Sequence, residues 1–316
     1  MEQRRAGDSD LRVSVVGLGC NNFGRRLDLE GTRAVVEAAI DAGINHFDTA
    51  EAYGDGESER FLGEILRGRR ERVVIATKFG RGPGAVDGVT PRGGREYLRK
   101  ALEGSLARLQ TDYVDLYYYH APDRVTPVAE TLAALDEAVR EGKVRYAAAS
   151  NFDAGQLRKA EEAARAHGTT RFVALQNQYS LLERDADDEV LPLCRELEVG
   201  FVPYFPLCSG LLTGKYRRGE PPPPGTRLSA RADLLDDERF DAVEQLAAFA
   251  EERGRTLHEL AIGALASTPG VASVIVGATK PEQVRANVTS GAWRLTAEEL
   301  AAVPRFERRG VHAPGR

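Results

Sequence analysis

The chain has 316 residues, of which 42% are apolar and 29% are charged, and its formal net charge is −5 at pH 7. These values are typical of a globular protein and give no reason to expect nucleic acid or an anionic membrane as a partner. The three cysteines lack metal-ligand spacing, and neither a membrane span of roughly 20 apolar residues nor a secretory signal is visible, so we expect a reduced, cytoplasmic protein.

Short apolar runs that alternate with helix-like segments predict eight strands. In chain order they are residues 13–19, 44–50, 72–78, 112–120, 143–150, 171–178, 199–206 and 271–278. Helical spacing is clearest from Leu98 to Leu109 and from Val128 to Val139, while Gly43 and Gly142 are placed to end two helices. Apolar runs without strict alternation are typical of a parallel sheet covered on both faces.

Eight strand–helix units favour a closed (β/α)8 TIM barrel, which typically has about 250 residues. A doubly wound Rossmann sheet is the alternative, but GLGCNNFG after the first strand lacks the GxGxxG spacing. We predict a single domain over 1–316, with the barrel at about 11–290. Residues 208–237 contain four consecutive prolines and predict a long functional loop at the mouth, and 291–316 predict an extra helix and a loose end.

Polar or small residues stand where the predicted strands end. They are Asp48, Lys78, His120, Ser150 with Asn151, Gln176, Tyr204 and Gly277, and Tyr53 follows shortly after Asp48. The active sites of such barrels form at the C-terminal ends of the strands, so these residues should meet at one mouth. His46, which precedes Asp48 on the same strand, is expected to be a packed histidine.

Tyr53, Lys78, Asp48 and His120 suit the delivery of a proton to a developing alkoxide. A tyrosine has an ordinary pKa near 10, and a neighbouring Lys78 ammonium should lower the pKa of Tyr53. Asp48 should keep Lys78 charged and oriented. His120 can orient a carbonyl oxygen or assist the proton transfer. The four residues do not form a metal triad, so we expect no metal.

Three segments resemble the catalytic tetrad of the aldo-keto reductase superfamily: DTAEAYG around Asp48 and Tyr53, TKFG around Lys78, and LYYYH ending at His120. The later segments ASNF, QNQYS, YFPLCSGLLTGKY and VGATKPEQVRAN resemble its nicotinamide cofactor segments in order, and the resemblance extends to the potassium-channel β-subunit branch. It implies a carbonyl reductase in which Tyr53 is the general acid, Lys78 and Asp48 tune it, and His120 positions a small-molecule carbonyl substrate.

The resemblance also implies a cofactor, NADPH in preference to NADH. Ser150, Asn151 and Gln176 would hydrogen-bond its carboxamide, and Tyr204 would stack on its ring. Its other contacts would come from Leu207, Ser209, Gly210, Leu212 and Lys215 near the pyrophosphate, and from Gly277, Thr279, Lys280, Gln283 and Asn287 toward the adenosine. Many members have arginine or lysine at the Thr279 position and glutamate at the Ala286 position, so we expect a weaker grip on the adenine here.

Two other functions stay open. The channel β-subunits bind NADP(H) and act through a partner, so a redox-sensing regulatory subunit is one alternative, although only about ten polar residues precede the first predicted strand. A class I aldolase-type barrel, with a Schiff base on Lys78, is the other alternative, and Tyr53 and the cofactor-like strand ends argue against it. The physiological substrate and the oligomeric state are not predicted.

Overall fold

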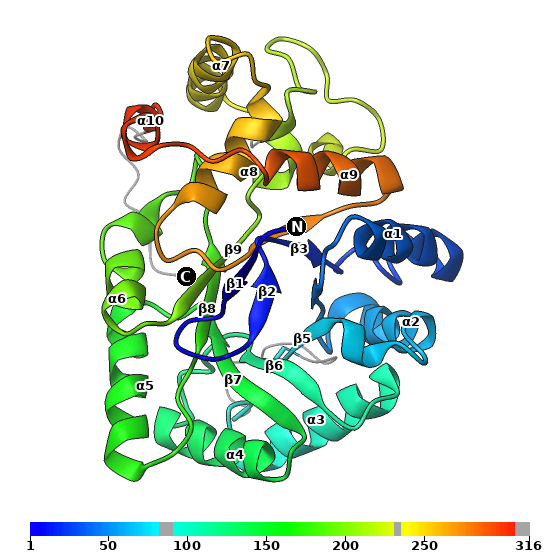
Figure 1. The fold of residues 1–316 in the computed structure, drawn as a ribbon, viewed down its shortest axis with the longest axis vertical. Helices are drawn as coiled ribbons and strands as arrows, with labels where there is room; N and C mark the ends of the chain where they lie inside the picture. The colour runs from blue at the N-terminus through cyan, green and yellow to red at the C-terminus, as the bar shows by residue number, and fades with distance from the viewer. Residues whose placement is uncertain (82–90, 231–234, 307–316) are drawn as a thin grey trace.

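The computed structural model describes residues 1–81, 91–230 and 235–306. Eight parallel strands form a ring in the order β10-β3-β4-β5-β6-β7-β8-β9 (Figure 1). They are β3 (Val16–Gly19), β4 (His46–Asp48), β5 (Val74–Phe79), β6 (Val114–Tyr119), β7 (Val144–Ser150), β8 (Ala174–Gln178), β9 (Gly200–Tyr204) and β10 (Val274–Gly277). The ring closes where Phe201 N donates to Gly270 O at 2.9 Å and Ala272 N donates to Phe201 O at 2.8 Å. The predicted barrel is confirmed, and an open Rossmann sheet is excluded.

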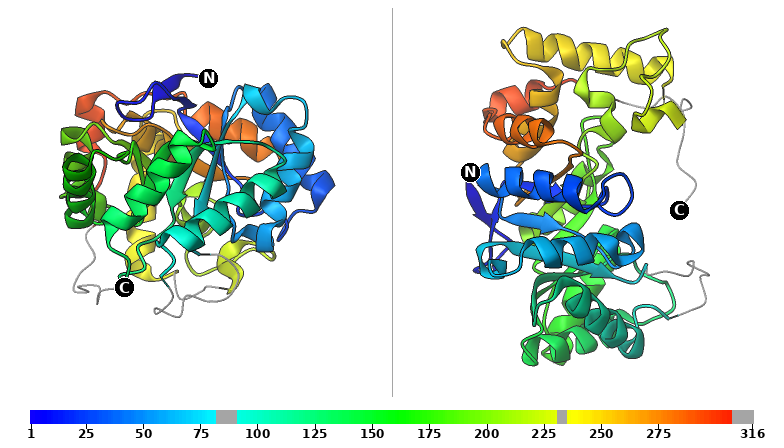
Figure 2. Two further views of the ribbon diagram at one scale, coloured as in Figure 1. Left: turned by 90° about the horizontal axis from the view of Figure 1, so that it is seen from below. Right: turned by 90° about the vertical axis from the view of Figure 1, so that its right-hand side faces the viewer.

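Helices alternate with the strands and cover the outside of the ring (Figures 1 and 2). They are α1 (Leu29–Asp41), α2 (Glu57–Ile65), α3 (Arg95–Leu109), α4 (Val128–Arg140), α5 (Ala154–His167), α6 (Val190–Glu196), α8 (Leu257–Ser267) and α9 (Pro281–Ser290). Two further helices are α7 (Asp237–Glu251), on the connection from β9 to β10, and α10 (Ala297–Ala302), the predicted extra helix. None of the helices within the described ranges is long and apolar enough to cross a membrane.

The ends of these helices follow from local residue chemistry. Asp28 caps α1, since its Oδ1 accepts a hydrogen bond from Gly31 N at 2.9 Å. Gly43 and Gly142 follow the ends of α1 and α4 with φ of 81° and 73°, a left-handed conformation that glycine adopts without a steric penalty. Both predicted helix ends are confirmed.

Side chains alternate across each strand, so the barrel has an inner core and an outer layer. On β5, Val74 and Ala76 belong to the inner core, while Ile75 and Phe79 pack in the layer between strands and helices. Lys78, two residues beyond Ala76, therefore lies on the inner face. The same alternation carries the strand-end polar residues into the mouth, which we define as the C-terminal end of the barrel interior.

A hairpin closes the other end of the barrel. Strand β1 (Gln3–Arg5) pairs antiparallel with β2 (Arg12–Ser14), and Ala6, Leu11 and Val13 join the inner core. The predicted strand 13–19 is therefore wrong as one element, because β2 and β3 part at Val15. The hairpin is hard to predict because few of its residues are apolar and the first ten residues look like a loose polar end.

The long loop after β9 lies on the mouth side, opposite the hairpin (Figure 2, right). It contains two 3-10 turns, η4 (Cys208–Thr213) and η5 (Arg227–Ala230). Arg218 ties it to α7 through Asp237 at 3.0 Å, Asp241 at 2.6 Å and Glu244 at 3.0 Å. Parts of the predicted loops and tail, at 82–90, 231–234 and 307–316, lie outside the described residues.

Candidate active site

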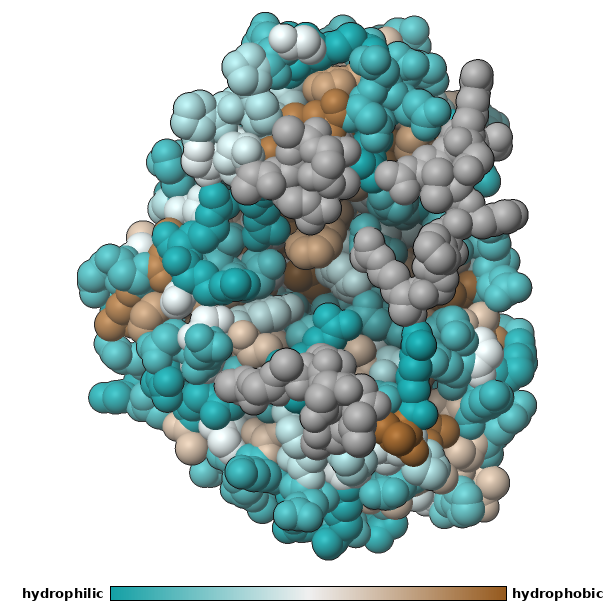
Figure 3. Space-filling view, turned by 180° about the vertical axis from the view of Figure 1, so that it is seen from behind, coloured by the Kyte–Doolittle hydropathy of each residue, from teal (hydrophilic) through white to brown (hydrophobic). Residues whose placement is uncertain are grey.

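The mouth opens as a hollow with apolar surface in its depth, on the face shown in Figure 3. Its centre is an ion pair between β4 and β5. Lys78 Nζ lies 2.7 Å from Asp48 Oδ2, and Lys78 is 0% and Asp48 2% exposed. Nζ also donates to Thr49 O at 2.8 Å. Burial lowers the pKa of Lys78, but Asp48 and Tyr53 raise it by more, so the amine stays charged at neutral pH.

Tyr53 opens the 3-10 turn η1 (Tyr53–Gly56) just after β4. Its hydroxyl lies 3.5 Å from Lys78 Nζ, which is 5.0 Å from the centroid of the phenol ring. Burial raises the pKa of Tyr53 and the Lys78 charge lowers it. The Lys78 charge lowers the pKa of Tyr53, as expected. The prediction that this pKa is lowered overall is wrong, because removing the phenol from solvent raises the pKa by more. Tyr53 therefore holds its proton at neutral pH, as a general acid must.

His120 follows the end of β6 and faces Tyr53. Their rings meet edge to face, with centroids 6.1 Å apart and planes at 83°. Burial, helped by the charges of Lys78 and Arg81, holds the pKa of His120 well below its usual value. Its buried Nδ1 has no hydrogen-bond partner among the described residues. A neutral imidazole here can donate a hydrogen bond to a carbonyl oxygen without competing for the proton.

The three residues predicted to bind the carboxamide and the tyrosine predicted to stack on the ring lie together on β7, β8 and β9 or just beyond them. Ser150 Oγ donates to Gln176 O at 2.7 Å, Asn151 Nδ2 donates to His120 O at 2.8 Å, and Tyr204 OH donates to Asn151 Oδ1 at 2.7 Å. Asn151 has a φ of 60°, which asparagine tolerates better than most residues. Gln176 Nε2 donates to Asp48 Oδ1 at 2.8 Å, so this group is joined directly to the ion pair.

The turn η4 carries the residues predicted to lie near a pyrophosphate. Cys208, Ser209 and Gly210 have φ values of 48°, 58° and 99°, and the N–H groups of Cys208 and Gly210 donate to Phe205 O at 2.9 Å and Leu207 O at 2.8 Å. The space beside Gly210 is taken by Lys215, whose Nζ would lie 3.1 Å from an added Cβ. Leu207 is half-buried, the side chain of Leu212 is fully buried, and Leu212 N donates to Leu207 O at 3.2 Å. Of the predicted pyrophosphate residues, Lys215 therefore supplies the charge, and the pyrophosphate contact stays a prediction.

The residues predicted for the adenosine end lie at the start of α9 and along it, beyond Gly277. Lys280 is exposed at the N-cap, with Pro281 in the first turn. Thr279 N and Thr279 Oγ1 donate to Gln283 Oε1 at 2.7 and 3.1 Å. Asn287 lies apart from them, since it is 4% exposed and its Oδ1 is 3.0 Å from His258 Nε2, between α8 and α9.

Sequence reasoning missed Arg227, at the start of η5. Its Nη2 donates to Asn21 Oδ1 at 3.1 Å and to Asn22 Oδ1 at 3.0 Å, which joins the long loop to the loop after β3. Its guanidinium lies 5.9 Å from the ring centroid of Phe205, and within the described residues it forms no ion pair. A cation held by neutral groups at the mouth can receive a phosphate. The only sequence signal is its place after the proline run.

His46 and Cys20 pack beneath the mouth, as expected. His46 is 0% exposed and its Nδ1 lies 2.9 Å from Ser273 Oγ, and burial lowers its pKa to about 4. Cys20 is fully buried, and its backbone N donates to Asp48 O at 2.9 Å. Neither side chain is placed to meet a substrate.

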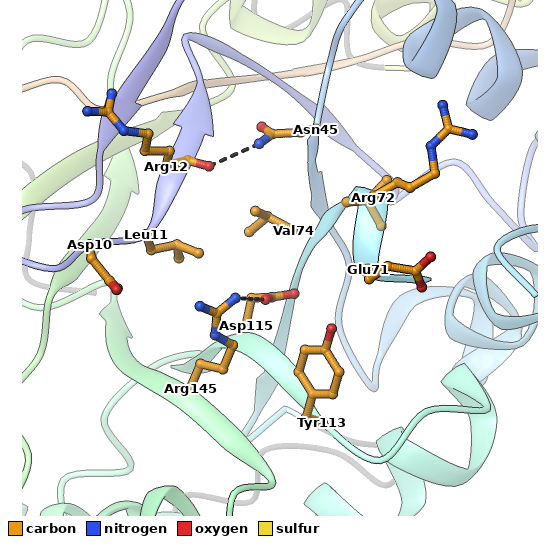
Figure 4. Close-up of a pocket in the computed structure, with 11 residues that line it drawn as sticks. Asp10, Leu11, Arg12, Asn45, Glu71, Arg72, Val74, Tyr113, Asp115 and Arg145 are labelled. Carbon is orange, nitrogen blue, oxygen red and sulfur yellow. Dashed lines mark hydrogen bonds and ion pairs between the residues drawn. The ribbon is translucent and has the colours of Figure 1, made fainter. Parts of the chain in front are cut away.

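A cleft of about 180 Å³ lies at the opposite end of the barrel, beside the hairpin (Figure 4). Asp115 lies in its wall and is paired with Arg145 at 3.0 Å. The guanidinium groups of Arg12 and Arg72 point away from Val74 at its centre (Figure 4). The polar groups of this cleft do not converge, whereas those of the mouth do. The mouth is therefore the candidate active site.

Comparisons with known proteins agree with this geometry. Residues 15–308 match the Aldo/keto reductase family. A probable voltage-gated potassium channel subunit beta from Oryza sativa subsp. japonica is 37% identical, over 91% of this chain and 90% of the relative. The uncharacterized oxidoreductase YrpG from Bacillus subtilis (strain 168) is also 37% identical, over 95% and 94%. L-glyceraldehyde 3-phosphate reductase from Escherichia coli (strain K12) is 34% identical, over 96% and 91%. This chain belongs to the aldo/keto reductase family and is an NAD(P)H-dependent oxidoreductase.

Proposed function

We propose that this protein reduces an aldehyde or ketone to an alcohol with NADPH, and that Tyr53 is its proton donor. The observation that carries the proposal is the position of the Lys78 ammonium. It contacts Asp48 Oδ2 at 2.7 Å, Thr49 O at 2.8 Å and Tyr53 OH at 3.5 Å, next to a neutral His120. This is the environment of a phenol that gives up its proton to a group gaining negative charge.

Each residue has a separate task in this scheme. When bound, the reduced nicotinamide supplies a hydride to the carbonyl carbon. Tyr53 donates its phenolic proton to the carbonyl oxygen, which completes the alcohol, and the Lys78 ammonium stabilises the phenolate that remains. His120 orients the carbonyl oxygen, and Asp48 keeps Lys78 charged and in place. The phenolate recovers a proton from solvent after the alcohol leaves.

The preference for NADPH rests on two cations. Lys280 is exposed at the start of α9, where the helix dipole also favours an anion, and Arg227 lies on the opposite loop with only neutral partners within the described residues. Together with the turn at Cys208–Gly210 they can bind the phosphates of a dinucleotide. We also propose a cytoplasmic location, because none of the three cysteines, Cys20, Cys194 and Cys208, forms a disulfide in the described chain.

The test is a fluorescence titration of the purified protein with NADPH and NADH, followed by turnover on a panel of aldehydes and ketones. The panel should include glyceraldehyde with and without a 3-phosphate, since one relative is named for that substrate. Tyr53→Phe should lower kcat about 10²- to 10⁴-fold and leave NADPH binding unchanged. Tyr113→Phe, at the far end of the barrel, is the matched control and should behave as wild type. Full turnover by Tyr53→Phe would refute its role.

Two alternatives give different results in the same experiment. The name of the Oryza sativa relative, a probable voltage-gated potassium channel subunit beta, favours a regulatory subunit, which would bind NADPH tightly without turning over any carbonyl. An aldolase would form a Schiff base on Lys78, and borohydride would trap its substrate there. The structure disfavours this second alternative, because a Schiff-base lysine must be a neutral amine, whereas burial lowers the pKa of Lys78 but Asp48 and Tyr53 together raise it by more.

A further inference from the structure

A hydrogen bond crosses the interior of the barrel. Gln176 lies on β8 and Asp48 on β4, which are four places apart in either direction around the ring. Gln176 Nε2 donates to Asp48 Oδ1 at 2.8 Å, and both residues are 2% exposed. The bond therefore joins opposite walls directly, without water between them.

This bond completes the coordination of Asp48. Lys78 Nζ donates to Oδ2 at 2.7 Å, so each carboxylate oxygen has its own donor on a different wall. A carboxylate held at one oxygen can turn about its last single bond, whereas one held at both oxygens cannot. The amide of Gln176 thus fixes the plane of Asp48, and Asp48 in turn fixes the Lys78 ammonium beside Tyr53.

The amide orientation of Gln176 follows from its partner. A carboxylate accepts hydrogen bonds and donates none, so the end of the amide that faces Asp48 is the NH2 group and Oε1 is turned away. The phenol of the fully buried Tyr118, on β6, lies beside the same amide. The backbone of Gln176 is held as well, because its O accepts from Ser150 Oγ at 2.7 Å and from Asn151 N at 3.1 Å.

We propose that Gln176 is a positioning residue that links the cofactor to the proton donor. Its NH2 group holds Asp48, and its Oε1 accepts the N–H of the cofactor carboxamide. When the cofactor carboxamide binds Oε1, it fixes the side-chain amide of Gln176. That side chain in turn fixes Asp48 and, through Asp48, Lys78 and Tyr53. The inference rests on the proposed function and adds to it a direct connection between cofactor binding and proton delivery.

Gln176→Glu tests the link, because a protonated glutamic acid keeps the shape of glutamine and can donate its O–H to Asp48. Burial and the Asp48 charge should raise the pKa of this new carboxyl above its ordinary value near 4.3. Below that raised pKa we expect kcat within about threefold of wild type. Above that pKa the new carboxylate and the Asp48 carboxylate face each other, and kcat should fall about 10- to 100-fold. The affinity for NADPH should fall by a smaller factor than kcat.

Two further variants separate this role from a merely structural one. Gln176→Met fills the same space without a donor and should lose kcat to a similar extent at every pH. Gln178→Glu places the same charge at an exposed position of β8 and should keep the wild-type pH profile. Circular dichroism and thermal unfolding at each pH establish that the variants are folded.

The outcomes are distinct. A folded Gln176→Glu variant that matches wild type at every pH, or that stays as inactive as Gln176→Met at low pH, would overturn the link between Gln176 and Asp48. A wild-type protein that turns over no carbonyl would refute the proposed function itself, and the inference with it. Recovery of kcat at low pH by Gln176→Glu alone supports the inference.

Discussion

Both ends of the barrel bury an aspartate against a basic side chain, but the two pairs differ in what surrounds them. At the far end, Asp115 accepts from Arg70 at 2.7 Å, Arg145 at 3.0 Å and Ile75 N at 2.9 Å. These partners tie β6 to its neighbours β5 and β7 and to the 3-10 turn η2 (Arg70–Arg72) before β5. At the mouth, the partner of Asp48 is a lysine whose third contact is a longer one, to the hydroxyl of Tyr53.

The contrast shows that a buried ion pair alone does not identify an active site. Arg70 and Arg145 also lie beside phenols, those of Tyr113 and Tyr146, but an arginine side chain does not exchange its proton in proteins, whereas a lysine can. Lys78 lies beside a phenol and a neutral imidazole, and both have pKa values shifted by burial. The pair that touches a group able to exchange a proton is the reactive one.

The strongest test of this contrast is Lys78→Met. The variant keeps the length of the side chain but removes the charge that stabilises the Tyr53 phenolate, so kcat should fall by about 10³-fold or more. NADPH binding should change by less than kcat, because the fully buried Lys78 is connected to the predicted carboxamide site only through Asp48 and Gln176. Single-turnover reduction with pre-bound NADPH measures the effect. A loss below about tenfold would mean that Lys78 does not tune the proton donor.

Asp115→Asn tests the other end. Removing one partner of a buried ion pair leaves the remaining cations without compensation, so the free energy of unfolding should drop by about 3 kcal/mol. Urea unfolding measures this change, and kcat/KM should remain within about twofold of wild type. If kcat/KM fell while stability held, the two ends would not be separate in function.

Lys280→Ala tests whether the exposed cation at the outer edge of the mouth distinguishes NADPH from NADH. The loss of one cation that pairs with a 2′-phosphate should weaken NADPH binding about tenfold and leave NADH binding nearly unchanged. Arg285→Ala, which removes an exposed positive charge from the same helix, is the control. Equal losses for both cofactors would show that Lys280 does not recognise the phosphate.

The smallest expected effect is that of pH on the wild-type protein. Burial raises the pKa of Tyr53 above 10 and lowers that of His120 well below 6.5. Neither group titrates between pH 6 and 8, so kcat/KM for reduction should vary less than about twofold there. It should fall as pH rises through the raised pKa of Tyr53, since the proton is then lost. A steep limb near neutral pH would contradict these protonation states.

The sequence was sufficient to predict the succession of the eight barrel strands and the residues at the mouth, because most of these strands are apolar runs with a polar residue at or next to their end. It predicted both ends of the contact between Asp48 and Lys78 for the same reason. The hairpin at 3–14 was missed, since a polar segment gives no periodic signal and its role depends on the few side chains that enter the barrel.

Other features depend on three-dimensional distances that no sequence pattern encodes. The net pKa direction of Tyr53 is set by how much water the fold removes, which residue types alone do not show. The bond from Gln176 to Asp48 joins residues 128 positions apart on opposite walls. Arg227 lies in a loop whose length and proline content predict function but not which side chain returns to the mouth.

The closure of the ring has a consequence for how the mouth is held. β10 pairs with β3 along its whole length, but its side of the ring meets β9 through one bridge, Phe201 with Val271, before β10 begins. β9 and the segment before β10 are therefore paired at the end of the barrel away from the mouth, and the pairing stops before the mouth is reached. The loop after β9 and the helix after β10 flank this opening. The two segments that we propose to bind phosphates therefore follow strands that do not pair with each other at the mouth within the described chain, whereas Asp48 and Lys78 stand on strands that do.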